Sequence, residues 1–183
     1  IVPGFHDAAL TDAFVRSLPS FVMPMIVKVY PTSPLAVYEW LQGHFSVASD
    51  EPAVPLVGIS FSAGTVGLAG ALALWQQQGG NVSKLIAVDG WGVPLIGLPA
   101  SRLSHDRFTH ASSLPLGAGD VNFYADPAVP HLNLWQAPES AAGIEVKGWQ
   151  LDRGVAMTAG EFLRRSLHAE WNAAFSWRAV TYR

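Results

Sequence analysis

The sequence predicts a single α/β domain over residues 1–183, a three-layer αβα sandwich with a mainly parallel sheet. Short β-branched or apolar runs recur about every 30 residues up to position 89, with helical spacing of apolar residues between them, as in right-handed βαβ crossovers. Half of the residues are apolar and 14% are charged, which suits a sheet buried on both faces. The length is enough for one full core.

Four strands and three helices are expected in order up to residue 89. A strand end precedes Gly4, and Asp7 is placed to cap the first helix. Ser33 and Pro34 are the residue types preferred at the N-cap and first position of the second helix. The third helix is apolar on every face, which predicts burial between the sheet and its neighbours. The later strands are expected at 25–30, 54–61 and 84–89, and the helices at 8–18, 33–43 and 65–78.

The regular order breaks after residue 89. Residues 90–120 hold three prolines and no sustained period, so we expect an excursion over one end of the sheet, where functional loops are common. A strand is expected at 121–126 and a strand or hairpin arm at 144–151. Thr158 and Glu161 form a capping box for a last helix that ends near residue 175.

Residues 56–75 (LVGISFSAGTVGLAGALALW) predict a strand, a sharp turn and a helix. Such a turn holds one side chain in a strained, exposed position above the sheet. Ser62 is the candidate, because small residues, Ser60 and Gly64, stand two positions before and after it. Ser60 is an alternative nucleophile, since its own flanks are also small. A buried pair of elements whose serines only satisfy backbone groups is a further interpretation. A membrane span is disfavoured by the four glycines and the lack of flanking basic residues.

A serine hydroxyl becomes a nucleophile when a base takes its proton and an acid orients that base. In an open parallel sheet, both partners come from loops at the carboxyl ends of strands. Asp89 closes the strand expected beside that of Ser62 and is the candidate acid, with Asp106 as the alternative. His131 follows the strand at 121–126 and completes the chain order Ser, Asp, His.

The segment from Ser60 through Asp89 resembles the corresponding piece of α/β-hydrolase thioesterase domains, with an elbow, a helix ending near glycine and a strand ending in the acid at similar spacing. The opening PGF resembles the H-G-hydrophobic loop of that superfamily, although Pro3 stands where histidine is usual and Ser60 where glycine is. The resemblance implies a compact α/β-hydrolase fold with no separate lid domain. It also implies an oxyanion hole made by the N–H groups of Phe5 and Ala63. The whole chain resembles an uncharacterised cyanobacterial branch of the superfamily.

Composition excludes several other functions. A net charge of −3 without a Lys/Arg run argues against nucleic acid as a partner, and no dinucleotide fingerprint or P-loop implies a cofactor. The absence of cysteine excludes a thiol nucleophile and cysteine-type zinc sites. His105, Asp106 and His110 could bind a divalent metal, but three ligand types without a fourth are a weak signal, and no metal site is expected.

The expected location is the cytosol, because no signal segment opens the chain. Ile1 already lies in a strand-like motif, so we allow for native residues, including a leader, before it. The oligomeric state is not predicted.

We expect a serine hydrolase that cleaves an ester or thioester of a small apolar acyl or aromatic substrate through an acyl-enzyme. The alternative is a non-catalytic hydrolase-fold protein that binds a hydrophobic small molecule. Side chains brought near the serine would line the pocket, although aromatic residues in so apolar a chain are mostly core. The candidates for substrate contact are His6, Phe61, Trp91, Phe108 and Trp135.

Overall fold

The computed structural model of the chain describes residues 1–45 and 55–181, with side chains up to residue 174. Within these residues, six strands form one sheet and lie in it in chain order: β1 (Leu56–Phe61), β2 (Val82–Val88), β3 (Ala100–Ser104), β4 (Val121–Ala125), β5 (Ala142–Lys147) and β6 (Gly154–Thr158). The helices are α1 (Ala8–Ser17), α2 (Pro34–His44), α3 (Gly64–Gln77), α4 (Arg107–Ser113), α5 (His131–Gln136) and α6 (Ala159–Thr181), with short 3-10 turns η1 (Leu114–Leu116) and η2 (Pro138–Ser140).

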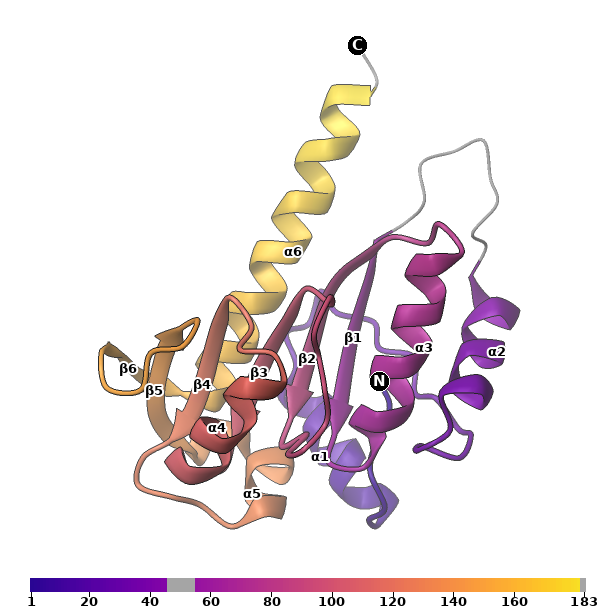
Figure 1. Cartoon of the computed structure of the whole chain (residues 1–183). Helices are drawn as coiled ribbons and strands as arrows, with labels where there is room; N and C mark the ends of the chain where they lie inside the picture. The colour runs from indigo at the N-terminus through magenta and orange to yellow at the C-terminus, as the bar shows by residue number, and fades with distance from the viewer. Residues whose placement is uncertain (46–54, 182–183) are drawn as a thin grey trace.

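The sheet is mostly parallel, as predicted (Figure 1). Strands β1 to β4 run parallel, and β5 and β6 add an antiparallel hairpin at one edge. In the register of the first pair, Phe61 lies beside Val88. The residues that follow these two strands, Ser62 and Asp89, therefore leave the sheet next to each other at its carboxyl end.

Helices cover both faces of the sheet, which gives the three layers expected. Helices α2, α3 and α4 lie on one face, and α1, α5 and α6 on the other (Figure 1). Apolar residues alternate between the two cores along β1: Ile59 and Phe61 pack with the α1, α5 and α6 side, whereas Leu56 packs with α2 and α3. None of the helices in the described residues is long and apolar enough to cross a membrane.

The strand expected at 25–30 is not formed. Val27 N–H donates to Ile1 O (2.9 Å), and the N-terminal segment in turn touches β1 through a single bridge at Val2. Pro3 has no N–H and cannot continue that ladder. Without a full partner strand, the segment stays extended at the edge of the sheet.

The excursion expected over 90–120 is wrong in part, because this stretch contains strand β3 and helix α4. All five residues of β3 are buried, including Ser101, Arg102 and Ser104. Polar residues at buried positions remove the apolar signature by which interior strands are recognised in a sequence. Strand β6 was not predicted from the sequence. It is short, pairs with β5 in a hairpin, and most of its residues are exposed.

The ends of several helices follow local capping rules. Asp7 accepts a hydrogen bond from Ala9 N–H, and Ser33 accepts one from Ala36 N–H ahead of Pro34. Thr158 Oγ1 accepts from Glu161 N–H (3.1 Å) at the start of α6.

Along α6, the expected inward face is only partly buried. Phe162 and Leu167 pack in the core, whereas Trp171 is 44% exposed. The side chain of Phe175, also expected to face the body, lies outside the described residues.

His110 on α4 makes the stability of the fold depend on pH. Its ring is fully buried and stacks on Tyr124 (ring centroids 5.2 Å apart). Nε2 lies 3.3 Å from Gln150 O, and Nδ1 has no hydrogen-bond partner in the part of the chain that the structure describes. Burial lowers the pKa of His110 from 6.5, a shift that the Gln150 carbonyl opposes and the charge of Arg102 reinforces.

Because the folded-state pKa is depressed, the unfolded chain takes up the proton first, and stability falls as the pH drops below about 6.5. We expect His110→Phe to reduce this slope of unfolding free energy against pH, which for one group is at most about 1.4 kcal/mol per pH unit. Urea unfolding at several pH values measures it. His44→Phe, on the exposed end of α2, should keep the wild-type slope; an unchanged slope in His110→Phe would refute the assignment.

Candidate active site

Ser62 occupies the sharp turn between β1 and α3. Its φ is +51°, a left-handed conformation uncommon for residues other than glycine. Its N–H donates to Val88 O (2.9 Å) and its carbonyl accepts from Thr65 N–H (3.0 Å), so the neighbouring strand and the first turn of α3 fix the turn. This geometry is the strained strand-to-helix turn predicted from the sequence.

Ser60, the alternative nucleophile, lies in the core. Its side chain is fully buried, and its Oγ is hydrogen-bonded to Thr65 Oγ1 (3.0 Å). The residue lies inside β1, paired with Ala87. A hydroxyl in this place holds the strand to the helix and is closed to a substrate.

Asp89 and His131 meet at the carboxyl end of the sheet. Asp89 follows β2, also has a φ of +51°, and is buried. Its Oδ2 lies 2.7 Å from His131 Nδ1, with a hydrogen bond between them. This is the pair expected from the sequence. His131 is the first residue of α5, and its side chain is 41% exposed, so Nδ1 faces the buried acid while the ring reaches solvent.

Phe61 and Trp135 pack in the core behind the site and do not line the cavity that contains Ser62. Both are buried, and their rings stack at 5.0 Å. Phe61 also stacks on the His131 ring (4.7 Å), and Trp135 stacks on Phe14 (3.6 Å). Neither residue, both predicted to contact substrate, lines the cavity of Ser62; they form an aromatic stack that packs against the imidazole of His131.

One cavity of about 350 Å³ joins the predicted groups. Ser62, Asp89 and His131 all line it. Its remaining walls come from the starts of α3 and α4 and from the loop after β2: Ala63, Val66, Trp91, Val93, His105 and Thr109.

The loop at residues 3–5 lies against the turn of Ser62. A Cβ added at Gly64 would come within 2.4 Å of Val2 O, so Gly64 is needed for the close approach, and one added at Gly4 would sit tightly at 3.2 Å from Ser62 Cβ. Among the described residues, the N–H groups of Phe5 and Ala63 donate to no backbone carbonyl. Ala63 lines the cavity, whereas Phe5 does not.

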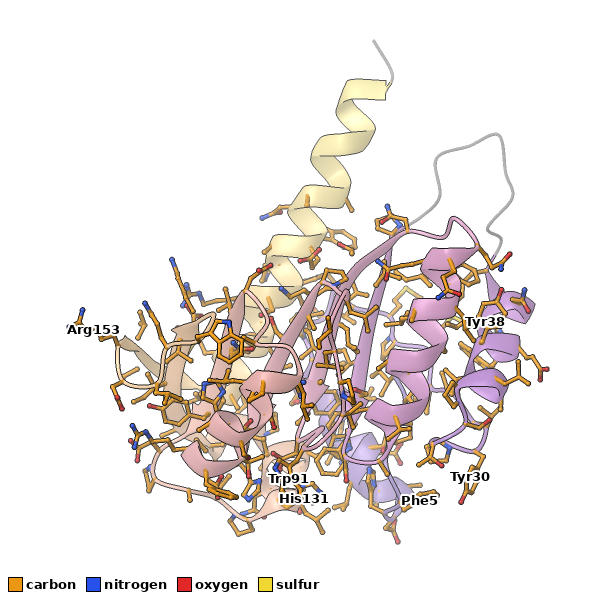
Figure 2. The ribbon with its side chains drawn as sticks, in the orientation of Figure 1. Phe5, Tyr30, Tyr38, Trp91, His131 and Arg153 are labelled. Carbon is orange, nitrogen blue, oxygen red and sulfur yellow. The ribbon has the colours of Figure 1, made fainter. Side chains whose placement is uncertain are left out.

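Of the residues predicted to contact substrate, Trp91 alone lines the cavity. It is 62% exposed, yet its Nε1 donates to Ser112 Oγ (3.0 Å), which holds the indole as a fixed wall. Trp91 and His131 lie together at this end of the molecule, and Phe5 lies at the same end, to one side of them (Figure 2). Phe108 is exposed on α4 outside the cavity lining, and His6 packs edge-on against Phe61.

His105 is the main site residue that the sequence did not assign to the triad. Its N–H donates to Asp89 Oδ1 (2.9 Å), and its Nδ1 lies 2.9 Å from Asp89 Oδ2. His105 follows β3 directly, and a polar residue at the end of a parallel strand is a candidate site residue. This position could not be recognised because the sequence did not predict β3. Asp106, the alternative acid, caps α4 by accepting from Thr109 N–H (2.6 Å) and has no hydrogen bond with His131 in the described structure.

His105, Asp106 and His110, whose spacing was only a weak metal signal, do not form a metal-ligating group within the described residues, and His110 points toward Gln150. Asp89, His105 and His131 instead bring one potential ligand atom each within 4.8 Å of one another. Two donors on a tetrahedral zinc ion would lie about 3.3 Å apart. The N···O separations of 2.7 and 2.9 Å here are those of hydrogen-bonding partners.

Arg102 fixes the loops that frame the cavity. Its guanidinium is buried, has no carboxylate partner among the described residues, and donates to four carbonyls: Gly117 O (2.8 Å), Gly90 O (3.3 Å), Val93 O (2.8 Å) and Leu116 O (3.1 Å). Burial lowers the pKa of Arg102 to about 10, so it stays protonated at neutral pH. One cation thereby ties the loop after β2 to the turn before β4.

We expect Arg102→Met to reduce the free energy of unfolding by about 3 kcal/mol, because several buried carbonyls lose their donor. Arg107→Met is the matched control: Arg107 pairs with Asp152 at the surface, and its loss should cost less than about 0.5 kcal/mol. Urea unfolding of the two variants measures the difference. Equal losses of unfolding free energy in the two variants would show that the Arg102 guanidinium does not hold these loops together.

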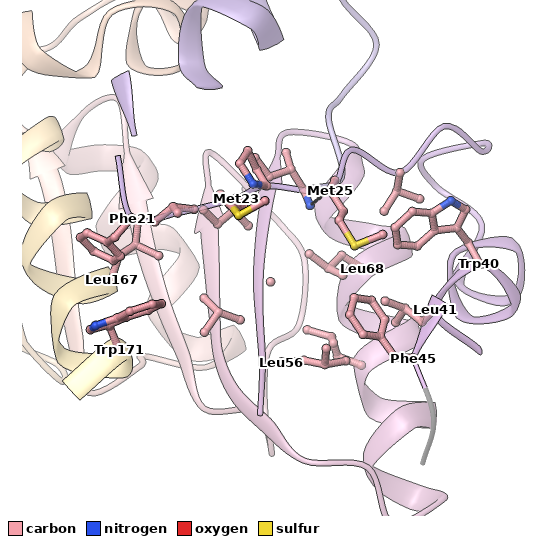
Figure 3. A pocket seen from close by; sticks show the side chains of 18 residues that line it. Phe21, Met23, Met25, Trp40, Leu41, Phe45, Leu56, Leu68, Leu167 and Trp171 are labelled. Atoms are coloured by element: carbon pink, nitrogen blue, oxygen red, sulfur yellow. Dashed lines mark hydrogen bonds between the residues drawn. The ribbon is translucent and has the colours of Figure 1, made fainter. Parts of the chain in front are cut away.

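A second cavity, of about 330 Å³, lies along the amino-terminal half of β1 (Figure 3). It shares no lining residue with the cavity of Ser62. Its walls are apolar side chains from the edge segment, α2, α3 and α6, including Met25, Trp40, Leu68 and Trp171.

Comparisons of the chain with protein-family models, with curated protein sequences and with solved structures found no match.

Proposed function

We propose that the protein is a serine hydrolase that cleaves an ester or thioester of an apolar acyl or aromatic substrate through an acyl-enzyme. The observation that carries the proposal is the single cavity lined by Ser62, Asp89 and His131. It lies where parallel strands end, the place at which open α/β sheets bind ligands.

In this proposal, Ser62 Oγ attacks the acyl carbon while His131 Nε2 takes the hydroxyl proton. Asp89 holds the Nδ1 proton of His131 and stabilises the imidazolium. Breakdown of the tetrahedral intermediate expels the alcohol or thiol, which receives the proton from His131. Water then attacks the acyl-enzyme with His131 again as the base, which releases the acid and restores Ser62. The N–H groups of Phe5 and Ala63 would stabilise the oxyanion in both steps.

A compact α/β-hydrolase fold without a separate lid domain is part of the proposal. It is supported by the placement of the nucleophile after β1, the acid after β2 and the histidine after β4, all at one end of a parallel sheet. The positive φ of Ser62 supports the elbow. No step of this mechanism calls for a cofactor.

We expect an apolar substrate because most of the cavity wall outside the triad is apolar, with His105 and Thr109 as its polar members. Val66, Val93 and Trp91 face the space beside Ser62, and no lysine or arginine lines the cavity among the described residues. We expect activity on p-nitrophenyl esters of increasing acyl length, and on the matching acyl thioesters of N-acetylcysteamine, to rise from acetyl toward longer or aromatic acyl groups. Activity confined to charged acyl groups would contradict this substrate class.

The alternative function, a non-catalytic protein that binds a hydrophobic small molecule, is favoured by the second cavity. Its volume of about 330 Å³ falls in the range of ligand pockets. The chain offers a matched pair of variants: Val57, 37% exposed, lines this cavity, and Val66, 41% exposed, lines that of Ser62. Binding of a fluorescent apolar probe that is lost in Val57→Lys and kept in Val66→Lys, without acyl hydrolysis by the wild type, would establish the alternative.

A further inference from the structure

Two histidines, and not one, contact the carboxylate of Asp89. His131 Nδ1 is hydrogen-bonded to Oδ2 at 2.7 Å, and His105 Nδ1 lies 2.9 Å from the same oxygen. The other oxygen, Oδ1, accepts from the backbone N–H of His105 (2.9 Å). His105 therefore touches both oxygens of the carboxylate that His131 uses.

The ring of His105 is placed to complete one more hydrogen bond. Its Nδ1 is buried and has no hydrogen-bond partner of good geometry in this arrangement, although Asp89 Oδ2 is within hydrogen-bond distance. A buried polar atom left unpaired costs free energy, and a small rotation of the imidazole would satisfy it. A carboxylate oxygen can accept from two donors, so both rings can bind Oδ2 together.

Asp106 lies near the other ring nitrogen of His105. Its Oδ2 lies 3.5 Å from His105 Nε2, while its Oδ1 caps α4 through Thr109 N–H. Burial raises the pKa of Asp106, but hydrogen bonds from Thr109 and Phe108 and the nearby His105 lower it more, so that it lies below its usual 3.8. Asp106 is thus an anion at a helix start, and the two ring nitrogens of His105 lie near two different carboxylates.

We propose that His105 is a positioning residue of this site: its backbone N–H and its imidazole, braced by Asp106, hold the Asp89 carboxylate in the orientation that accepts from His131. The effect on catalysis rests on the proposed function, whereas the effect on the Asp89–His131 hydrogen bond does not. The titratable groups in contact with the ring are Asp89, Asp106 and His131.

We expect a catalytic effect because the Asp89 carboxylate could rotate if the His105 ring no longer held it. Asp89 leaves the sheet at a left-handed residue, and its side chain can rotate about two torsions. His131 itself is partly exposed, so the acid must orient the base. Apart from His131 itself, loss of the imidazole leaves the His105 backbone N–H, on Oδ1, as the donor in the described residues that fixes the acid.

His105→Phe, which keeps a ring and removes both nitrogens, tests the proposal. We expect kcat for the best ester to fall about tenfold, the change that corresponds to one lost hydrogen bond, with KM unchanged. We also expect the acid limb of the pH profile of kcat/KM to move. The downfield proton resonance of His131 Nδ1–H should shift or broaden. His105→Asn, whose amide can reach the Nδ1 position, should restore most of each property.

His44→Phe is the matched control and should match the wild type in all three measurements. If His105→Phe does not fold, as judged by thermal melting, His105→Gln replaces it, since its amide reaches the Nε2 position but not Nδ1. A variant with the wild-type kcat, pH profile and His131 resonance would overturn the proposal. If the wild type has no hydrolase activity, the proposed function fails, and the resonance alone decides: a shift supports the positioning role and an unchanged signal overturns it.

Discussion

Replacing Ser62 with alanine is expected to abolish acyl hydrolysis, with a loss in kcat on the order of a millionfold. The substitution removes the atom that forms the covalent bond to the acyl group, so no part of the acyl-enzyme route survives. The backbone of the turn is held by Val88 O and Thr65 N–H, and these contacts do not involve the side chain. Steady-state kinetics on the best ester, with circular dichroism to confirm folding, measures the effect.

Ser60→Ala is the matched control for this prediction. It removes the hydrogen bond to Thr65 Oγ1 inside the core, which should lower the free energy of unfolding by about 1 kcal/mol. Its kcat should stay within a modest factor of the wild type. If instead Ser60→Ala abolished turnover and Ser62→Ala preserved it, the nucleophile would be Ser60 and the assignment of the turn would be wrong.

If the proposed function holds, Asp89→Asn should lower kcat by about ten-thousandfold, as the same substitution of the triad acid does in a serine protease. The asparagine amide would present N–H groups to His131 Nδ1, which selects the wrong tautomer for a base that faces Ser62. The fold should survive, because asparagine tolerates the positive φ of residue 89. Kinetics and thermal melting together separate the catalytic loss from a loss of structure.

Asp106→Asn provides the comparison between the two acids. Asparagine can still cap α4 at Thr109 N–H, and Asp106 has no hydrogen bond to His131 within the described residues. We therefore expect at most about a tenfold loss, the size of one altered hydrogen bond. A loss in Asp106→Asn as large as that in Asp89→Asn would contradict the choice of Asp89 as the acid.

The part of the fold that carries the site could be predicted from the sequence. Residues 56–89 have a strong apolar strand signal, a turn of small residues and an apolar helix, and the structure forms β1, α3 and β2 there. Because β1 and β2 pair in parallel, the positions of Ser62 and Asp89 at one edge followed from the order of the elements alone.

Strand β3 could not be predicted, because its buried side chains include Ser101, Arg102 and Ser104. Arg102 is satisfied by carbonyls from loops distant in the chain, and such tertiary partners leave no local pattern. Missing β3 also hid the role of His105, which follows it directly.

Aromatic residues were the least predictable part of the site. Phe61, Trp91 and Trp135 all lie close in sequence to proposed site residues, yet only Trp91 faces the cavity. Phe61 lies on the face of β1 opposite Ser60, so pleat alternation turns it into the core, where it supports His131. Proximity in sequence could not distinguish an aromatic residue that lines the cavity from one that packs in the core behind His131.

The central claim is that Ser62 is an activated nucleophile, and labelling with a fluorophosphonate tests it most directly. The account predicts one phosphonyl adduct per chain, found by mass spectrometry on the peptide that contains Ser62, absent in Ser62→Ala and kept in Ser60→Ala. Labelling should slow strongly in Asp89→Asn, because the base is then misoriented. An adduct on another residue, or no adduct on the folded wild-type protein, would contradict the account.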